Sequence, residues 1–253
     1  LMALAGLSLF LLEAGMGTAA LLLFFPPRTL GKGFFALHGI LAAAFLSGAW
    51  LGRPSGYPSA LSFAPAALLL VYTALAWAGR AAAARPVLAL GAAAAGWALV
   101  GVASSAPRPH GDAWTIAGAF LGGLFLGAVV LTMNLGHWYL VSRSLPFRLL
   151  ARGALLFGAL AAARTALLGA AFAADPNPAG LSSLLSLERD ALFFLFRVTW
   201  GIVGPLALSY FIWKTADMRS NQAATGLLYV ALVFVLIGEL LSSYLTVATG
   251  FPA

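Results

Sequence analysis

The sequence contains no cysteine, and only 8% of its 253 residues are charged. Without cysteine, the chain cannot form disulfides, thiolate metal sites or iron–sulfur ligation. A soluble domain carries roughly 25% charged residues, so the shortage of charge excludes an ordinary water-soluble fold. Hydrophobic residues make up 62% of the chain, and its mean hydropathy is +0.98. Lipid is therefore the expected solvent of this protein.

Sequence motifs of the common enzyme classes are also missing. The chain has no Walker A loop, no His-Glu-x-x-His and no Gly-x-Ser-x-Gly, which leaves nucleotide hydrolysis, zinc proteolysis and serine hydrolysis without their usual machinery. The net charge of +7 is spread over short connections and does not form a basic patch. We therefore expect no nucleic-acid partner, no metal site of the protein's own, and a non-catalytic or quinone-reactive role if the chain serves an enzyme.

Long apolar stretches, separated by proline and glycine, predict an all-α integral membrane protein with eight transmembrane helices in a single domain, residues 1–253. The apolar core near the start is interrupted by Glu13, which argues against a cleavable signal peptide. A short amphipathic surface helix is expected around Leu181–Leu185. The expected spans are Leu1–Phe25, Phe34–Gly52, Leu61–Gly79, Val87–Ser105, Trp114–Ser142, Leu149–Ala173, Ala191–Trp213 and Ala224–Ala248.

Lysine and arginine are unevenly shared between alternate loops. The even-numbered loops carry only Arg53, Arg108 and Arg189. Cytoplasmic loops are rich in lysine and arginine, so the odd-numbered loops are expected on the cytoplasmic side and both termini on the outer side of the cell inner membrane. The odd-numbered loops carry Arg28, Lys32, Arg80, Arg85, Arg143, Arg148, Arg152, Lys214 and Arg219.

Four charged residues interrupt the expected spans: Glu13, Arg164, Arg197 and Glu239. Charges inside a membrane are costly and are usually paired or functional. The predicted topology places all four in the middle or outer part of the bilayer, where two acids and two bases can neutralise one another. One interpretation is an ion-pair network that fixes the order of the helices. The other is a polar cavity for a quinone, a proton or a substrate.

Polar side chains also gather at the cytoplasmic side. His38 and His137 are expected at the same depth on two helices, which is the minimum for bis-histidine ligation of haem b. Asn134, His137 and Trp138 are spaced to share one helical face. A quinone carbonyl could accept a hydrogen bond there, so quinone and haem are both candidate cofactors, and we expect the two histidines to be hydrogen-bonding residues.

The last expected span contains Leu236-Ile-Gly-Glu-Leu-Leu-Ser-Ser-Tyr-Leu245. This segment resembles the final helix of the polysulfide reductase/DMSO reductase membrane-anchor family, which often carries a Gly-Glu-Leu-Leu-x-Arg-Tyr type of sequence. The present chain has Ser243 at the arginine position. The resemblance implies eight helices with outward termini, electron exchange between a quinone and an iron–sulfur partner subunit, and a place for Glu239 near the quinone.

These observations favour a membrane subunit of a respiratory or electron-transfer complex that binds menaquinone or ubiquinone and anchors an iron–sulfur or cytochrome subunit. The candidate quinone-binding residues are Glu13, His38, Asn134, His137, Trp138, Arg164, Arg197 and Glu239. Two alternatives stay open. One is a b-type cytochrome subunit with haem between His38 and His137, and the other is a transporter or channel whose path uses the buried charges.

Overall fold

The computed structural model describes residues 2–53, 62–105, 112–142, 145–146, 148–174 and 189–250, and every regular element in this part is helical. The all-α prediction is therefore confirmed. The expected amphipathic helix at Leu181–Leu185 lies outside the described residues. The elements are α1 (Met2–Leu22), α2 (Pro27–Leu51), α3 (Ala64–Trp77), α4 (Ala81–Ala103), α5 (Asp112–Val141), α6 (Arg148–Ala174), α8 (Arg189–Val198), the π-helix η1 (Thr199–Val203), α9 (Gly204–Asp217) and α10 (Asn221–Thr249).

Seven helical segments are long and apolar enough to cross a membrane, and α8, η1 and α9 together form one of them. The eighth helix, α3, has 14 residues. At 1.5 Å per residue this helix is roughly 21 Å long, shorter than the ~30 Å hydrocarbon core. The chain is thus a multi-pass helical bundle suited to a membrane, with seven helices of spanning length and one shorter helix in its described part.

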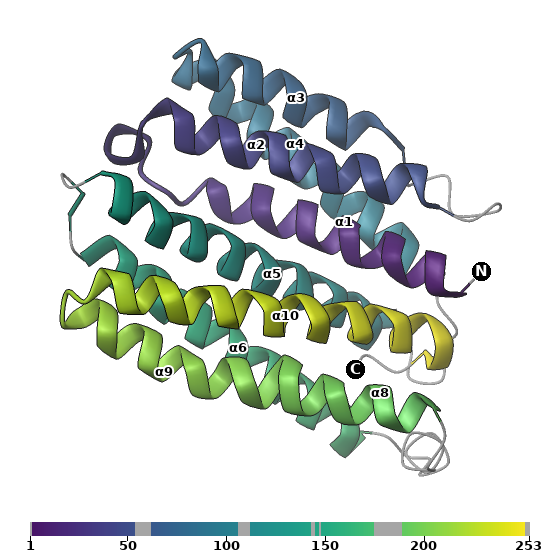
Figure 1. Cartoon of the computed structure of the whole chain (residues 1–253). Coiled ribbons are helices and arrows are strands. Elements are labelled where there is room, and N and C mark those ends of the chain that lie inside the picture. The colour runs from purple at the N-terminus through teal and green to yellow at the C-terminus, as the bar shows by residue number, and fades with distance from the viewer. Residues whose placement is uncertain are drawn as a thin grey trace.

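The helices pack as two four-helix bundles that lie side by side (Figure 1). In the first bundle, α1 to α4 follow one another and α4 returns to contact α1. In the second, α5 contacts α6, α6 contacts α9, and α10 closes the ring against α9 and α5. The bundles meet mainly where α1 packs on α5 and α10, so α1 and α5 are central helices.

Glycines allow the central pair to approach closely. A Cβ atom on Gly17 would overlap the carbonyl oxygen of Gly123, and one on Gly127 would overlap the backbone of Gly17. Small residues four positions apart permit this kind of backbone contact. Between helices in lipid there is no hydrophobic driving force, so van der Waals packing at such contacts stabilises their association. The Gly123-x-x-x-Gly127 pattern is therefore the packing seam between the two bundles.

Proline and glycine mark the helix ends as the sequence predicts. Pro27 occupies the first turn of α2, where the missing backbone N–H has no partner to lose. Gly31 adopts a φ of +73° and separates that first turn from the rest of α2, which agrees with an expected span that starts at Phe34. Gly79, with a φ of +75°, ends α3, and the Arg80 amide donates back to the Leu75 carbonyl.

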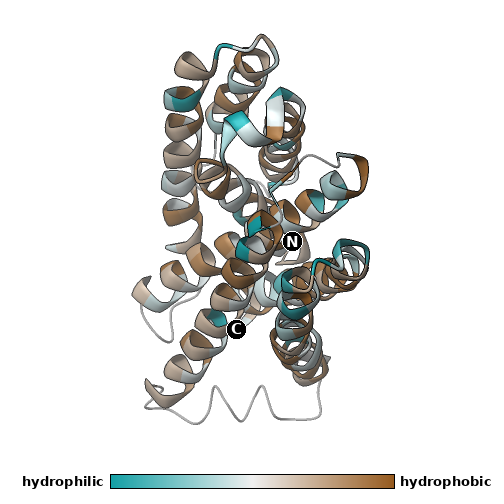
Figure 2. Ribbon diagram, turned by 90° about the vertical axis from the view of Figure 1, so that its left-hand side faces the viewer, coloured by the Kyte–Doolittle hydropathy of each residue, from teal (hydrophilic) through white to brown (hydrophobic). Residues whose placement is uncertain are grey.

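Hydrophobic residues predominate along the helices (Figure 2), and many large ones are exposed, as expected for a surface in contact with lipid. Leu70, Trp97, Leu155 and Val233 are all at least 47% exposed. Exposed cations gather instead at one end, where α1 joins α2, α3 joins α4, α5 joins α6 and α9 joins α10 (left in Figure 1). This positive end comprises Arg28, Lys32, Arg80, Arg85, Arg148, Arg152, Lys214 and Arg219. The first turn of α1 and the last turn of α10 lie at the opposite end (Figure 1).

Candidate functional site

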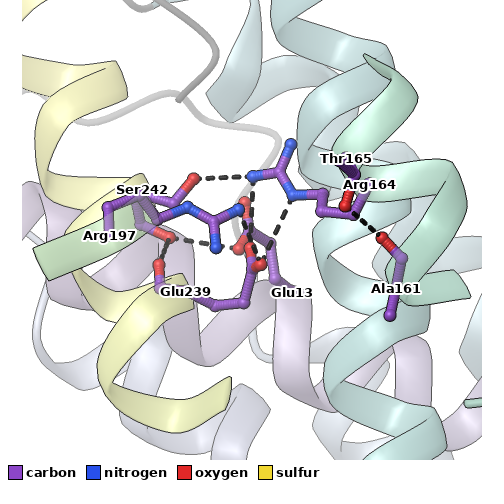
Figure 3. Close-up of polar contacts among 8 residues, drawn as sticks. Glu13, Ala161, Arg164, Thr165, Arg197, Glu239 and Ser242 are labelled. Carbon is purple, nitrogen blue, oxygen red and sulfur yellow. Dashed lines mark hydrogen bonds and ion pairs between the residues drawn. The ribbon is translucent and has the colours of Figure 1, made fainter. Parts of the chain in front are cut away.

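The four charged residues that interrupt the spans meet at the junction of the two bundles (Figure 3). Glu13 comes from α1, Arg164 from α6, Arg197 from α8 and Glu239 from α10. Their exposed fractions are 4%, 3%, 0% and 0% in that order. We call these residues the buried ion cluster. The expected ion-pair network is present, and it joins four helices that are far apart in the sequence.

Within the cluster, Glu239 carries both ion pairs. The Arg164 guanidinium donates in parallel from Nε and Nη2 to the two carboxylate oxygens of Glu239, at 3.3 and 3.2 Å. Arg197 Nη2 lies 2.9 Å from Glu239 Oε1, and Arg164 Nη2 also donates to Ser242 Oγ at 2.6 Å. Two-pronged arginine–carboxylate contacts combine strength with a fixed orientation, so Glu239 holds α6 and α8 against α10.

The second carboxylate is held differently. Glu13 Oε2 lies 3.1 Å from the hydroxyl of Ser243, and this contact is its hydrogen bond within the described residues. Glu13 is the member of the buried ion cluster that comes from the first bundle. Its formal negative charge balances the net positive charge of Arg164, Arg197 and Glu239. The two acids thus share one site but have unlike partners.

Backbone features make room for the cluster. A Cβ on Gly122 of α5 would lie 2.8 Å from Glu239 Oε2, so a larger residue there would displace the Glu239 carboxylate. Arg197 is followed by the π-helix η1, and a Cβ on Gly201 would lie 2.5 Å from Arg197 Nη1 and 2.6 Å from the Cα of Gly238. Single π-helical turns often occur at functional sites, because the extra residue re-aims the side chains around it.

A second polar link between the bundles involves His38 of α2. Its Nδ1–H donates to the carbonyl of Phe34 at 2.7 Å, and Asn134 Nδ2 of α5 donates to its Nε2 at 3.1 Å. Trp138, one turn after Asn134, packs edge-on against Phe34 with 5.6 Å between ring centroids. Asn134 and Trp138 therefore share a face of α5, as their spacing predicts, and in the structure this face is turned toward α2.

His137 lies apart from these residues. Its side chain is exposed and its Nδ1 is 3.3 Å from the hydroxyl of Tyr229 on α10. Neighbouring residues of a helix point in different directions. Trp138 therefore contacts α2, whereas His137, the residue before it, contacts α10. A haem iron would need a free nitrogen from each ring, whereas both ring nitrogens of His38 are already hydrogen-bonded. The histidine arrangement does not fit haem ligation and matches the expected hydrogen-bonding role.

A cavity of about 570 Å³ lies among α1, α2, α3 and α4 at the positive end. Phe25 and Phe35 form part of its apolar wall, Tyr72 adds a hydroxyl, and the exposed Lys32 and Arg85 lie at its rim. Tyr72 is 2% exposed, and its hydroxyl is 3.5 Å from the carbonyl of Phe35, a long contact for a hydrogen bond. We call this space the α1–α4 cavity.

The α1–α4 cavity is separate from every candidate residue chosen from the sequence, because none of those residues lines it. Gly31 and Gly79, both with positive φ, belong to its wall, and a Cβ on either would meet nothing within 4 Å. The sequence signal for this cavity was weak. It consisted of glycines beside loops and one tyrosine in an apolar span, and neither feature implies a cavity until four helix ends are brought together.

No family model, no curated protein and no solved structure matches this chain. The resemblance to the polysulfide reductase/DMSO reductase anchors therefore stays a prediction. It rests on Leu236–Leu245, which the structure places in the second half of α10, with Glu239 at the centre of the buried ion cluster.

Proposed function

We propose that this chain is the membrane subunit of an electron-transfer complex, that it crosses the cytoplasmic membrane eight times with both termini outside, and that it binds a quinone in the α1–α4 cavity. The cavity carries this proposal. Its volume of about 570 Å³ falls in the usual ~300–1,000 Å³ range of small-molecule sites. Such sites combine apolar walls with a few polar groups that fix the orientation of the ligand.

The chemistry of the lining suits a quinone. The flat ring and apolar tail of a quinone need aromatic and aliphatic walls, which Phe25 and Phe35 supply. Its carbonyl oxygens need donors, and Tyr72 can turn its hydroxyl toward the ligand because its contact with the Phe35 carbonyl is long. A bound quinone supplies two-electron redox chemistry, and the protein supplies position, shielding from water and electrostatics.

The positive end provides the reason to expect a partner at the cavity side. Cations there orient the chain with this end in the cytoplasm, by the positive-inside rule. They also complement an acidic surface, which steers association. An iron–sulfur or cytochrome subunit docked there would sit directly over the α1–α4 cavity. This part of the proposal rests on the resemblance in α10 together with the charge of the positive end.

Extraction of the purified protein tests the proposal. The full chain would be isolated in mild detergent, and its bound lipids would be identified by liquid chromatography and mass spectrometry. Ala82→Trp introduces a large ring into the cavity wall from an exposed position. Ala89→Trp places the same ring on an exposed position of α4 that does not line the cavity. We expect copurified quinone in the wild-type protein and in Ala89→Trp, and its loss in Ala82→Trp.

Tyr72→Phe gives a finer test, because it removes only a hydroxyl. A single hydrogen bond contributes about 1 kcal/mol, so quinone affinity should fall roughly fivefold. Phospholipid without quinone in the extract, or equal quinone occupancy in Ala82→Trp and Ala89→Trp, would refute the quinone site. A solute flux through the reconstituted protein with no bound quinone would favour the transporter or channel alternative.

A further inference from the structure

We infer that Glu13 is a proton-binding site inside the membrane, whose carboxyl group alternates between the ionised and protonated forms, with Ser243 as its adaptable hydrogen-bond partner. This inference goes beyond the proposed function and does not depend on a quinone. It rests on three observations: the hydrogen bonds of Ser243, the unequal partners of the two carboxylates, and two buried hydroxyls of α1 that have no partner in the described part of the chain.

The hydroxyl of Ser243 faces two acceptors but has one hydrogen. Ser243 Oγ lies 3.1 Å from Glu13 Oε2 and 3.0 Å from the backbone carbonyl of Glu239. A hydroxyl donates one hydrogen bond and can accept others. If Ser243 donates to the Glu239 carbonyl, as serines in helices often do toward the residue four positions back, its contact with Glu13 requires a proton on Glu13. If Glu13 is ionised, Ser243 turns and donates to it. Glu13 Oε2 thus keeps a hydrogen bond with Ser243 in both protonation states.

The ion pairs single out the same carboxylate. Both arginines pair with Glu239. Glu13 has no ion pair of its own among the described residues, although its charge would complete the neutrality of the cluster. Its ionised form is therefore supported by the field of Arg164 and Arg197 and opposed by Glu239 and by burial. This balance makes Glu13 the member of the cluster able to change state.

The neighbouring elements bring no further ionisable group to Glu13 in the described part of the chain. From α5 the facing residue is Gly122. The cationic residues of α2 and α4 are exposed, away from the cluster, and His38 of α2 is bonded to Asn134. The charged groups that determine the state of Glu13 are thus the other three members of the buried ion cluster.

Two buried hydroxyls lie on α1 on either side of Glu13. Ser8 and Thr18 are 1% and 0% exposed, and neither hydroxyl has a hydrogen-bond partner among the described residues. Each lies five residues from Glu13, or about 7.5 Å along the helix axis. Buried polar groups without a protein partner are usually satisfied by internal water. Water at these two places would lie within about two helical turns of Glu13 on α1.

Infrared difference spectroscopy can test the inference with the full chain in lipid nanodiscs. Acidification should produce the C=O band of a protonated carboxylic acid, which moves to lower frequency in heavy water. We expect Glu13→Gln to lose this band and Glu13→Asp to keep it at a changed frequency. If Glu13→Gln does not fold, the frequency change in Glu13→Asp still tests whether the band belongs to residue 13. A band that persists unchanged in folded Glu13→Gln protein would overturn the inference.

A matched serine pair tests the hydrogen-bond argument. Ser243→Ala removes the partner of Glu13 and should shift its C=O band, whereas Ser242→Ala removes a hydroxyl that accepts from Arg164 and should leave the band in place. The two substitutions are the same in chemistry and adjacent in α10. Equal spectra for both variants would show that Ser243 does not bond to the protonated carboxyl, and would overturn the proposed exchange.

Discussion

The sharpest energetic prediction concerns Glu239, because its single carboxylate forms ion pairs with two buried arginines. Glu239→Gln keeps the size and most of the hydrogen-bonding capacity of the side chain but removes its charge. Arg164 and Arg197 are 3% and 0% exposed, so water cannot replace the lost partner. Breaking a buried ion pair by removing one member costs about 3–5 kcal/mol. We therefore expect Glu239→Gln to be among the most destabilising single changes in this chain.

The magnitude can be measured by thermal unfolding in detergent. For a chain of this size, each kcal/mol lowers Tm by roughly 2–4 °C, so the expected loss is on the order of 10 °C. Asp217→Asn is the matched control, since Asp217 is an exposed acid at the end of α9. The control should change stability by less than about 0.5 kcal/mol.

A compensating variant separates the charge argument from general damage. Adding Arg197→Met to Glu239→Gln leaves Glu13 and Arg164 as one acid and one base, so the site is neutral again. Buried ion pairs can be replaced by apolar groups at little cost. The double variant should therefore melt above Glu239→Gln alone. If Glu239→Gln melts like the wild-type protein, or if the double variant loses the sum of both single effects, the reasoning is wrong.

Three further predictions follow from the fold. Gly17→Ala should prevent close packing of α1 on α5 and lower Tm strongly, whereas Gly226→Ala, where a Cβ meets nothing within 4 Å, should be neutral or stabilise by up to about 1 kcal/mol; equal melting temperatures would contradict the packing seam. His38→Ala should cost about 1 kcal/mol for its bond to Asn134 beyond the loss of volume, and a double-mutant cycle with Asn134→Ala measures that coupling; a value near zero would argue against the bond. Reporter fusions should place the loop between α5 and α6 in the cytoplasm and the C-terminus outside, and the reverse result would contradict the expected topology.

The sequence predicted the helices well because their signals are local. A stretch of apolar residues has to form a helix in lipid, where each backbone group needs an internal partner. Proline and glycine, such as Pro27 and Gly79, predicted helix ends because their backbone preferences act within a turn. The weak point was α3, where the expected span Leu61–Gly79 is longer than the 14 residues of the observed helix.

The candidate site was predicted in part. Charged residues are rare within the expected spans, so Glu13, Arg164, Arg197 and Glu239 stood out. Two acids and two bases can neutralise one another, which predicted that these four residues would lie close together. Helical spacing put His137 with Asn134, but the structure pairs it with Tyr229 instead. The spacing of residues along one helix gives only the approximate directions in which their side chains point. Which neighbouring helix each side chain contacts depends on the packing of the whole bundle.

The sequence by itself determined the lipid environment, the all-α fold class and the identity of the buried charged residues. Each of these follows from composition or from residues close together in the chain. Only the tertiary structure decided that both arginines pair with Glu239 and that Glu13 is left with Ser243. It also decided that four helix ends together line the α1–α4 cavity. These features depend on contacts between residues up to 230 positions apart. Such contacts are set by the packing of α1 against α5 and α10 of the second bundle, which no local sequence pattern encodes.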